Sequence, residues 1–161
     1  MANYTFIALI MKLYTFAPYC FMVLYARDIM KEYTFMLGEE VSASEAAKIM
    51  GNDHVGFVIV KVNDKPYGIV TEWDFINKVI AKDLDPKSVK LKDIMNAPLM
   101  SVDPKTPTDQ VTVLMDKHGV RRVPVVENGR LIGVITSRDV LRIFKDYMDN
   151  LSDVIARFGN F

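Results

Sequence analysis

Two short segments of this sequence carry residue types that could bind a phosphorylated ligand. Each has a threonine followed three residues later by an aspartate: Thr71 and Asp74 in GIVTEWDF, and Thr136 and Asp139 in GVITSRDV. This spacing is typical of a capping box, which stabilises a helix by about 1 kcal/mol. The same helix start offers free N–H groups to a phosphate, and a carboxylate there can accept ribose hydroxyls. The residues alone leave helix capping and nucleotide binding both open.

A pair of arginines adds a second group suited to anions. Arg121 and Arg122 lead into a strand-like run, and a guanidinium can bind phosphate through two parallel hydrogen bonds. Because neighbouring residues of a regular strand point to opposite faces, we expect at most one of the two to face a given cleft. A solvated strand edge is the alternative for this pair.

The two motifs belong to a tandem repeat with a constant offset of 65 residues. Residues 28–80 align with residues 93–145 without a gap, and 11 of the 53 aligned positions are identical. Each repeat is predicted to run from an extended segment through a helix and a β-hairpin to a second helix. The helices are expected near residues 42–50, 73–82, 107–118 and 138–148. The predicted fold class is α+β, with two β-α-β-β-α repeats packed sheet to sheet.

We divide the chain into four parts on this basis. They are an apolar N-terminal extension (1–25), repeat 1 (26–86), repeat 2 (87–148) and a C-terminal tail (149–161). The extension is expected to form a strand or helix packed on the domain or on a second subunit. Its length would suit a membrane helix, but Lys12 near its middle and Pro18 argue against a membrane partner. Met11 is a second candidate start, with residues 1–10 as an upstream extension.

The composition describes a folded protein with balanced charge. Half of the 161 residues are hydrophobic, and Lys+Arg and Asp+Glu number 20 each, which argues against nucleic acid as the main partner. The single Cys20 fits a cytoplasmic protein. With only His54 and His118, the chain has too few nitrogen and sulfur ligands for zinc, and neither histidine has a recognisable nucleophile partner. We expect no catalytic residues and no metal site.

The repeated pattern resembles the CBS domain, the module named after cystathionine β-synthase. The likeness rests on DIM at 93–95, RRVPVV at 121–126, the Asn128-Gly129 turn and GVITSRDV, and it covers about residues 27–146. Such domains occur in pairs with pseudo-twofold symmetry. The resemblance implies a stand-alone, non-enzymatic sensor that binds AMP, ADP or ATP as a homodimer and requires no cofactor. The alternatives are S-adenosylmethionine binding, nucleic-acid binding, and a structural or oligomerisation role without ligand.

The resemblance also implies roles for individual residues. In repeat 2 these are Asp139 for the ribose, Thr136, Arg138, Arg121 and Arg122 for phosphate, and Met100 and Val120 for the base. The matching positions in repeat 1 are Asp74, Thr71, Phe35 and Val55. Because Gly56, Phe57 and Trp73 stand where repeat 2 has arginines, we expect the Asp139 cleft to bind better than the Asp74 cleft. Arg121 or Arg122 could also reach the Asp74 cleft, since the two clefts share both repeats.

Overall fold

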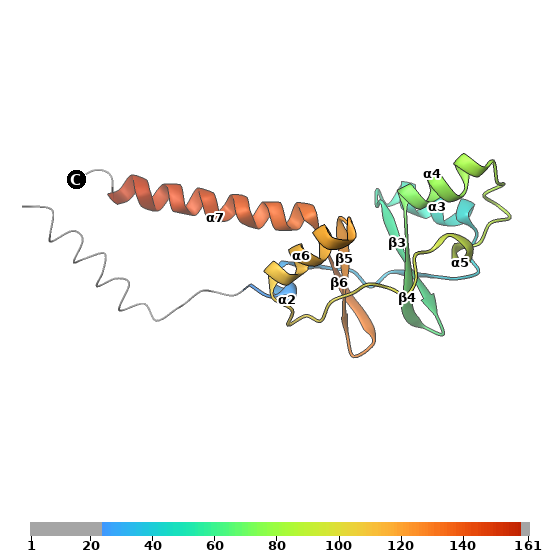
Figure 1. Cartoon of the computed structure of the whole chain (residues 1–161), viewed down its shortest axis with the longest axis horizontal. Coiled ribbons are helices and arrows are strands. Elements are labelled where there is room, and N and C mark those ends of the chain that lie inside the picture. The colour runs from blue at the N-terminus through green and yellow to red at the C-terminus, as the bar shows by residue number, and fades with distance from the viewer. Residues whose placement is uncertain (1–23, 159–161) are drawn as a thin grey trace, which may run out of the picture.

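A computed structural model describes the backbone of residues 24–158 and, apart from residues 147, 151 and 153–158, their side chains. Two three-stranded sheets lie side by side, with helices on their outer sides and one long helix that extends away from the body (Figure 1). One sheet has the order β2-β3-β4 and the other the order β1-β6-β5. The α+β class and the pairing of two similar units are therefore confirmed.

Repeat 1 supplies one of these sheets. Its elements are β2 (Met36–Gly38), α3 (Ala43–Asn52), β3 (Phe57–Val62), β4 (Lys65–Thr71), α4 (Glu72–Lys78) and a 3-10 helix η1 (Ile80–Lys82). The side chain of Ser42 caps α3 by accepting a hydrogen bond from the backbone N–H of Glu45. Strands β3 and β4 form an antiparallel hairpin, and both turn residues, Asn63 and Asp64, have positive φ, as a type I′ turn requires.

Repeat 2 has the equivalent helix, hairpin and second helix, preceded by a short opening helix. They are α5 (Leu91–Ile94), α6 (Thr108–His118), β5 (Arg122–Glu127), β6 (Arg130–Thr136) and α7 (Ser137–Phe158). Its hairpin turns at Asn128 and Gly129, again with positive φ at both residues. The first strand is reduced to a single parallel bridge between Val102 and Val125. Both hairpins carry a register shift at equivalent positions, Val60/Lys61 and Val125/Val126, so even this irregularity is duplicated.

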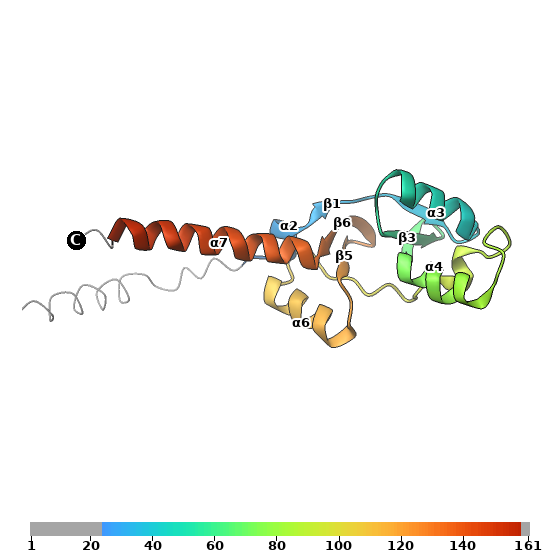
Figure 2. The ribbon, with the colours of Figure 1, turned by 90° about the horizontal axis from the view of Figure 1, so that it is seen from above.

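The segment that opens each repeat packs against the other repeat. Helix α2 (Ala26–Ile29) buries its apolar side chains against Val111, Met115 and Ile135 of repeat 2. In the same way, Leu91 and Ile94 of α5 lie in the core of repeat 1. Figure 2 shows α2 and β1 (Lys31–Glu32) beside β6 and α7, although they are far apart in sequence. The exchange ties the two repeats into one folding unit.

Two equivalent glycines make room for this exchange. Lys31 lies opposite Val134 on β6, and its equivalent, Asn96, forms a bridge with Ile69 on β4. A Cβ at Gly133 would lie 2.8 Å from the Lys31 carbonyl oxygen, and one at Gly68 would lie 3.1 Å from that of Asn96. The glycine that begins each Gly-x-x-Thr-x-x-Asp motif is thus needed for close backbone approach.

A third group of buried side chains joins the two sheets. Alternate residues of β3 face opposite ways, so Val58 and Val60 pack against the helices of repeat 1. Phe57 and Ile59 instead meet Leu131 and Val134 of β6. This contact confirms the predicted packing of sheet against sheet.

The structure differs from the sequence-based expectation mainly at two helices. The helix expected at residues 73–82 ends at Lys78 and continues as η1 after Val79, whose backbone leaves helical geometry. The helix expected at residues 138–148 runs to Phe158, into the predicted tail, because no glycine or proline interrupts residues 137–158. Of the predicted apolar extension, residues 1–23 lie outside the described part of the chain. Within residues 24–158, no helix is long and apolar enough to span a bilayer.

Candidate functional site

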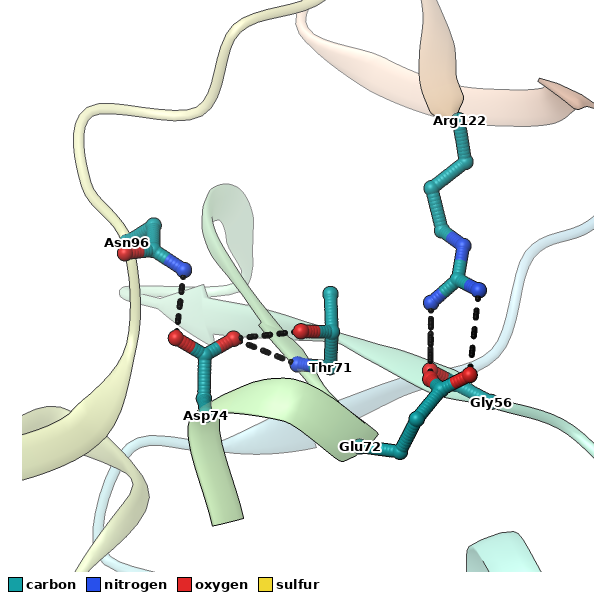
Figure 3. A network of polar contacts seen from close by, with 6 residues as sticks. All are labelled: Gly56, Thr71, Glu72, Asp74, Asn96 and Arg122. Carbon is teal, nitrogen blue, oxygen red and sulfur yellow. Dashed lines mark hydrogen bonds and ion pairs between the residues drawn. The ribbon is translucent and has the colours of Figure 1, made fainter. Parts of the chain in front are cut away.

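Asp74 sits at the start of α4, with both of its carboxylate oxygens hydrogen-bonded. Oδ2 accepts hydrogen bonds from the Thr71 backbone N–H at 2.8 Å and the Thr71 hydroxyl at 2.7 Å. Oδ1 accepts from the Asn96 side-chain amide and pairs with Lys78 Nζ, both at 2.9 Å. Figure 3 shows Thr71 and Asn96 converging on this carboxylate from β4 and from the exchanged segment. The capping box is confirmed, and it uses most of the bonding capacity of Asp74.

Asp139 occupies the equivalent position at the start of α7. Its Oδ2 accepts a hydrogen bond from the Thr136 backbone N–H at 2.9 Å and another from the Thr136 hydroxyl. Its Oδ1 lies 3.2 Å from Lys31 Nζ and 3.5 Å from the Arg142 guanidinium. Neither cation has hydrogen-bond geometry, so within the described residues this buried oxygen has no hydrogen-bond partner. Asp139 is completely buried, and its Oδ1 is balanced by these two ion pairs but accepts no hydrogen bond from the described part of the chain, so it could still accept one from a ligand.

Both aspartates are held in the charged form. Burial raises the pKa of Asp74, but hydrogen bonds from Lys78, Thr71 and Asn96 outweigh it and leave the pKa below its ordinary value. Burial likewise raises the pKa of Asp139, and the hydrogen bonds from Thr136 together with the close ion-pair contact of Lys31 outweigh it and leave the pKa below its ordinary value. Two carboxylates are therefore available as acceptors at neutral pH.

A cavity of about 550 Å³ opens beside Asp74, and we call it the Asp74 cavity. Repeat 1 contributes Thr71, Glu72 and Trp73 to its wall. The facing wall comes from repeat 2 and the segment before it: Asn96, Pro98, Met100, Gly119, Val120, Arg121, Arg122 and Pro124. The volume is in the range of small-molecule sites.

A second cavity, of about 520 Å³, opens beside Asp139, and we call it the Asp139 cavity. Repeat 2 contributes Val134, Thr136, Ser137, Arg138 and Asp139, together with Arg121 and Arg122. Repeat 1 contributes Lys31, Glu32, Tyr33, His54, Val55, Gly56, Phe57 and Glu72. The Tyr33 hydroxyl is buried without a hydrogen-bond partner in the described part of the chain. Burial, with the nearby charge of Asp53, raises the pKa of Tyr33 to about 12.

One ion pair lies on the wall shared by the two cavities. Arg122 Nη1 lies 3.0 Å from Glu72 Oε2, and the same nitrogen donates a hydrogen bond to the Gly56 carbonyl oxygen. Figure 3 shows the guanidinium reaching across from β5 to these two groups. The guanidinium also lies 5.1 Å from the centre of the Phe57 ring, which is cation–π distance.

The structure brings most of the predicted residues to one of the two cavities, but it divides them differently. Met100 and Val120, assigned with Asp139, line the Asp74 cavity, and Val55 lines the Asp139 cavity. The reason is that each aspartate faces the other repeat, so apolar partners come from across the pseudo-twofold axis. Phe35 is exposed and lines neither cavity.

The arginine pair also differs from the expectation of one side chain per cleft. Both Arg121 and Arg122 line both cavities. Strand β5 begins at Arg122, so Arg121 precedes the regular strand and alternation does not apply to it. This placement agrees with the expectation that Arg121 or Arg122 could also reach the Asp74 cleft.

Several residues at these cavities carried no signal in the sequence. Lys31 and Asn96 are equivalent in the repeat register and each contacts the aspartate of one cavity. Their equivalence could be read from the alignment, but their contacts depend on the exchange of segments between repeats. Glu72, Tyr33 and His54 also line the Asp139 cavity, and Glu72 pairs with Arg122 of the other repeat. Among residues 24–158 no cluster of three metal-ligating side chains is present.

Comparison with known proteins places the chain among proteins with paired repeats of this kind. The family model described as the CBS domain matches residues 26–81 and 91–146. The chain is 34% identical over 119 residues to a protein of Methanopyrus kandleri, and the match covers 73% of this chain and 61% of the relative's length. The chain thus spans less than two thirds of that relative.

Solved structures show the same architecture. A hexameric CBS-CP12 protein from bloom-forming cyanobacteria is 34% identical, with a TM-score of 0.69 over 74% of this chain and 71% of the other. The CBS domain pair of protein MJ0100, in complex with 5′-methylthioadenosine and S-adenosyl-L-methionine, is 28% identical, with a TM-score of 0.69 over 78% of this chain and 98% of the other.

Proposed function

This chain belongs to the CBS domain family as a pair of repeats, a regulatory module, and from that premise we propose that it senses an adenine nucleotide (AMP, ADP or ATP). The observation that carries the proposal is the Asp139 cavity. There a completely buried carboxylate has one oxygen without a hydrogen-bond partner in the described residues, at the start of a 22-residue helix. Ribose hydroxyls are donors that would satisfy that oxygen.

The remaining walls of the Asp139 cavity suit the other parts of a nucleotide. The apolar side chains of Val55 and Phe57 offer a surface for a planar base. Arg121, Arg122 and Arg138 offer guanidinium groups for phosphate, close to the N-terminal end of α7. The ligand would contact both repeats, so its binding would favour one arrangement of the two sheets over another. That is how a non-enzymatic module could pass on a signal.

A second candidate ligand is an adenosyl compound without phosphate. The similar domain pair of MJ0100 binds 5′-methylthioadenosine and S-adenosyl-L-methionine. The Asp74 cavity, lined by Trp73, Met100 and Val120, is the more apolar of the two in its side chains and fits such a ligand. A structural module without ligand is the remaining alternative, since both capping boxes are complete without one.

Thermal unfolding and calorimetry test this proposal. The protein is titrated with AMP, ADP, ATP, adenosine, 5′-methylthioadenosine and S-adenosylmethionine. A ligand present at 100 times its Kd should stabilise the fold by about 2.7 kcal/mol. A melting temperature that none of them changes at millimolar concentration would support the structural alternative. Stabilisation by the adenosyl compounds alone would select the second candidate.

We also propose that the module works as a homodimer in the cytoplasm. Exposed apolar side chains on the helices favour self-association: Ile76 lies on α4, Ile80 begins η1, and Leu141 and Phe144 lie on α7, all more than 40% exposed. Ile76 and Ile80 line a shallow groove between α3 and α4, and Leu141 lines another between α6 and α7. Light scattering after gel filtration measures the mass. Leu141→Glu and Ile80→Glu should each weaken the dimer, whereas Glu127→Gln, on an exposed strand end, should not.

A further inference from the structure

Glu72 holds the arginine that both cavities share. Arg122 and Glu72 approach in parallel, with Nη1–Oε2 at 3.0 Å and Nη2–Oε1 at 3.4 Å. Two carboxylate oxygens facing two guanidinium nitrogens is the arrangement in which arginine binds a phosphate or a carboxylate. The carboxylate of Glu72 therefore occupies the fork that a ligand phosphate would use.

The pair has no counterpart across the pseudo-twofold axis. At the offset of 65 residues, Glu72 matches Ser137 and Arg122 matches Phe57. The backbone contact at this point is duplicated, because Glu72 N–H donates to the Gly56 carbonyl and Ser137 N–H donates to the Arg121 carbonyl. The side-chain ion pair is thus an addition to a symmetric backbone, and the cap of α4 does not require it.

The charge of Glu72 matters for both cavities. Two basic and two acidic side chains line the Asp74 cavity, and four basic and three acidic ones line the Asp139 cavity. Glu72 is one of the acidic groups in each. Burial raises the pKa of Glu72, but the hydrogen bond and charge of Arg122 outweigh it and lower the pKa overall. The side chain stays negative at neutral pH, and half of it is exposed, so it can move aside.

We propose that Glu72 is an internal competitor for ligand phosphate, so that it sets how strongly the protein distinguishes phosphorylated from unphosphorylated adenosyl ligands. This inference rests on the proposed function. A nucleoside uses the aspartate and the apolar walls and leaves the ion pair in place. A phosphate must either displace the Glu72 carboxylate from Arg122 or bind beside its negative charge, and both lower its affinity.

The test compares AMP with adenosine, which differ only in the phosphate, by calorimetric titration of the wild type and of Glu72→Gln. The variant should bind AMP about tenfold more tightly, as expected for loss of a like charge at a partly solvated site. Its affinity for adenosine should stay within about twofold of the wild type, so the ratio of the two Kd values changes. Glu127→Gln makes the same chemical change on an exposed strand end outside both cavities and should leave the ratio unaltered.

A second variant reaches the same contact without changing charge. A Cβ at Gly56 would lie 2.5 Å from both carboxylate oxygens of Glu72, so Gly56→Ala should push the carboxylate away from Arg122. Gly56→Ala should also raise the affinity for AMP relative to adenosine. The effect should be smaller than that of Glu72→Gln, because the negative charge of Glu72 remains near the site. In Arg122→Ala, adding Glu72→Gln should produce a smaller gain in AMP affinity, because the negative charge is still lost but no guanidinium fork is left to release.

The outcomes separate the two proposals. If neither the wild type nor Glu72→Gln binds any adenosyl ligand while both unfold at similar temperatures, the proposed function is wrong. If both proteins bind but the AMP to adenosine ratio is the same, nucleotide sensing stands and the role of Glu72 is wrong. An AMP affinity that appears only in the variant would support the role of Glu72 and would refute AMP as a ligand of the wild type.

Discussion

The Asp74 and Asp139 cavities descend from one repeated motif, yet their aspartates are satisfied differently. Asp74 is hydrogen-bonded on both oxygens, by Thr71 on one side and Asn96 on the other. Asp139 keeps the threonine contacts but has Lys31 where the other cavity has Asn96. The Asn96 amide donates a hydrogen bond to the second oxygen of Asp74. Lys31, whose side chain is mostly exposed, forms an ion pair with the second oxygen of Asp139 but no hydrogen bond. The same four-residue motif therefore has two hydrogen-bonded carboxylate oxygens in one site and one hydrogen-bonded and one ion-paired oxygen in the other.

The difference shows that the Thr-x-x-Asp motif alone does not separate helix capping from ligand binding. Both uses need the threonine and the aspartate at the same spacing. The contact that differs between the two sites comes from the exchanged segment, from Lys31 at Asp139 and from Asn96 at Asp74. The residue directly before each aspartate also differs in charge. The cationic Arg138 lines the Asp139 cavity, and the uncharged Trp73 lines the Asp74 cavity.

The most direct way to test the comparison is to remove each aspartate. We expect Asp139→Ala to weaken AMP binding about 100-fold and Asp74→Ala at most about tenfold, because only Asp139 has a carboxylate oxygen that accepts no hydrogen bond within the described residues. Calorimetry measures both. Asp139→Asn and Asp74→Asn, which keep an acceptor for the Thr N–H, guard against loss of the fold. Equal losses in the two cavities would refute the asymmetry.

The two motif glycines extend the comparison to stability. Gly133→Ala should destabilise the fold by about 2 kcal/mol and Gly68→Ala by about 1 kcal/mol, since overpacking against fixed backbone is costly. The added Cβ would lie 2.8 Å from the Lys31 carbonyl in the first case and 3.1 Å from the Asn96 carbonyl in the second. Urea unfolding gives both values. Gly38→Ala is the control, since nothing lies within 4 Å of its added Cβ.

The exposed residues before each aspartate offer a smaller test. Arg138→Ser should weaken AMP binding about fivefold and leave adenosine unchanged, as expected for a solvated cation near a phosphate. Trp73→Ser should not alter the preference for phosphate, since an indole carries no charge. A change in adenosine affinity with Arg138→Ser would show that the guanidinium acts on the nucleoside rather than on the phosphate.

The smallest expected effect is on the pH dependence of stability. The folded-state pKa of both aspartates lies below the ordinary value, so their contribution is fully present above about pH 4–5 and lost as the pH falls through the folded-state pKa. Asp139→Asn and Asp74→Asn should each flatten the fall in unfolding free energy below that pH. Urea titrations from pH 7 to pH 3 measure it. A variant with the wild-type slope would show that folding does not lower the pKa of that aspartate.

Much of this architecture could be predicted from the sequence because its signals are local or repeated. The hairpins at Asn63-Asp64 and Asn128-Gly129, the helix starting after Ser42 and the two capping boxes each depend on residues within a few positions of one another. The gapless 65-residue register predicted two equivalent units. The extent of α7 was missed because sequence similarity between the repeats ends before the helix does.

Which residues line each cavity could not be predicted from such local signals. The motif analysis grouped Met100 and Val120 with Asp139, and the fold places them with Asp74. The contacts of Lys31 with Asp139, of Asn96 with Asp74 and of Glu72 with Arg122 join residues of different repeats or of the exchanged segments.

By itself, the sequence determined the duplicated α+β fold and the chemical groups available for binding, because propensity, capping and repeat register act over short distances along the chain. Only the tertiary structure decided which groups meet. The packing of two sheets and the exchange of opening segments bring side chains from distant parts of the chain together. As a result, one aspartate is hydrogen-bonded on both oxygens, while its equivalent has one oxygen that is ion-paired but accepts no hydrogen bond within the described residues.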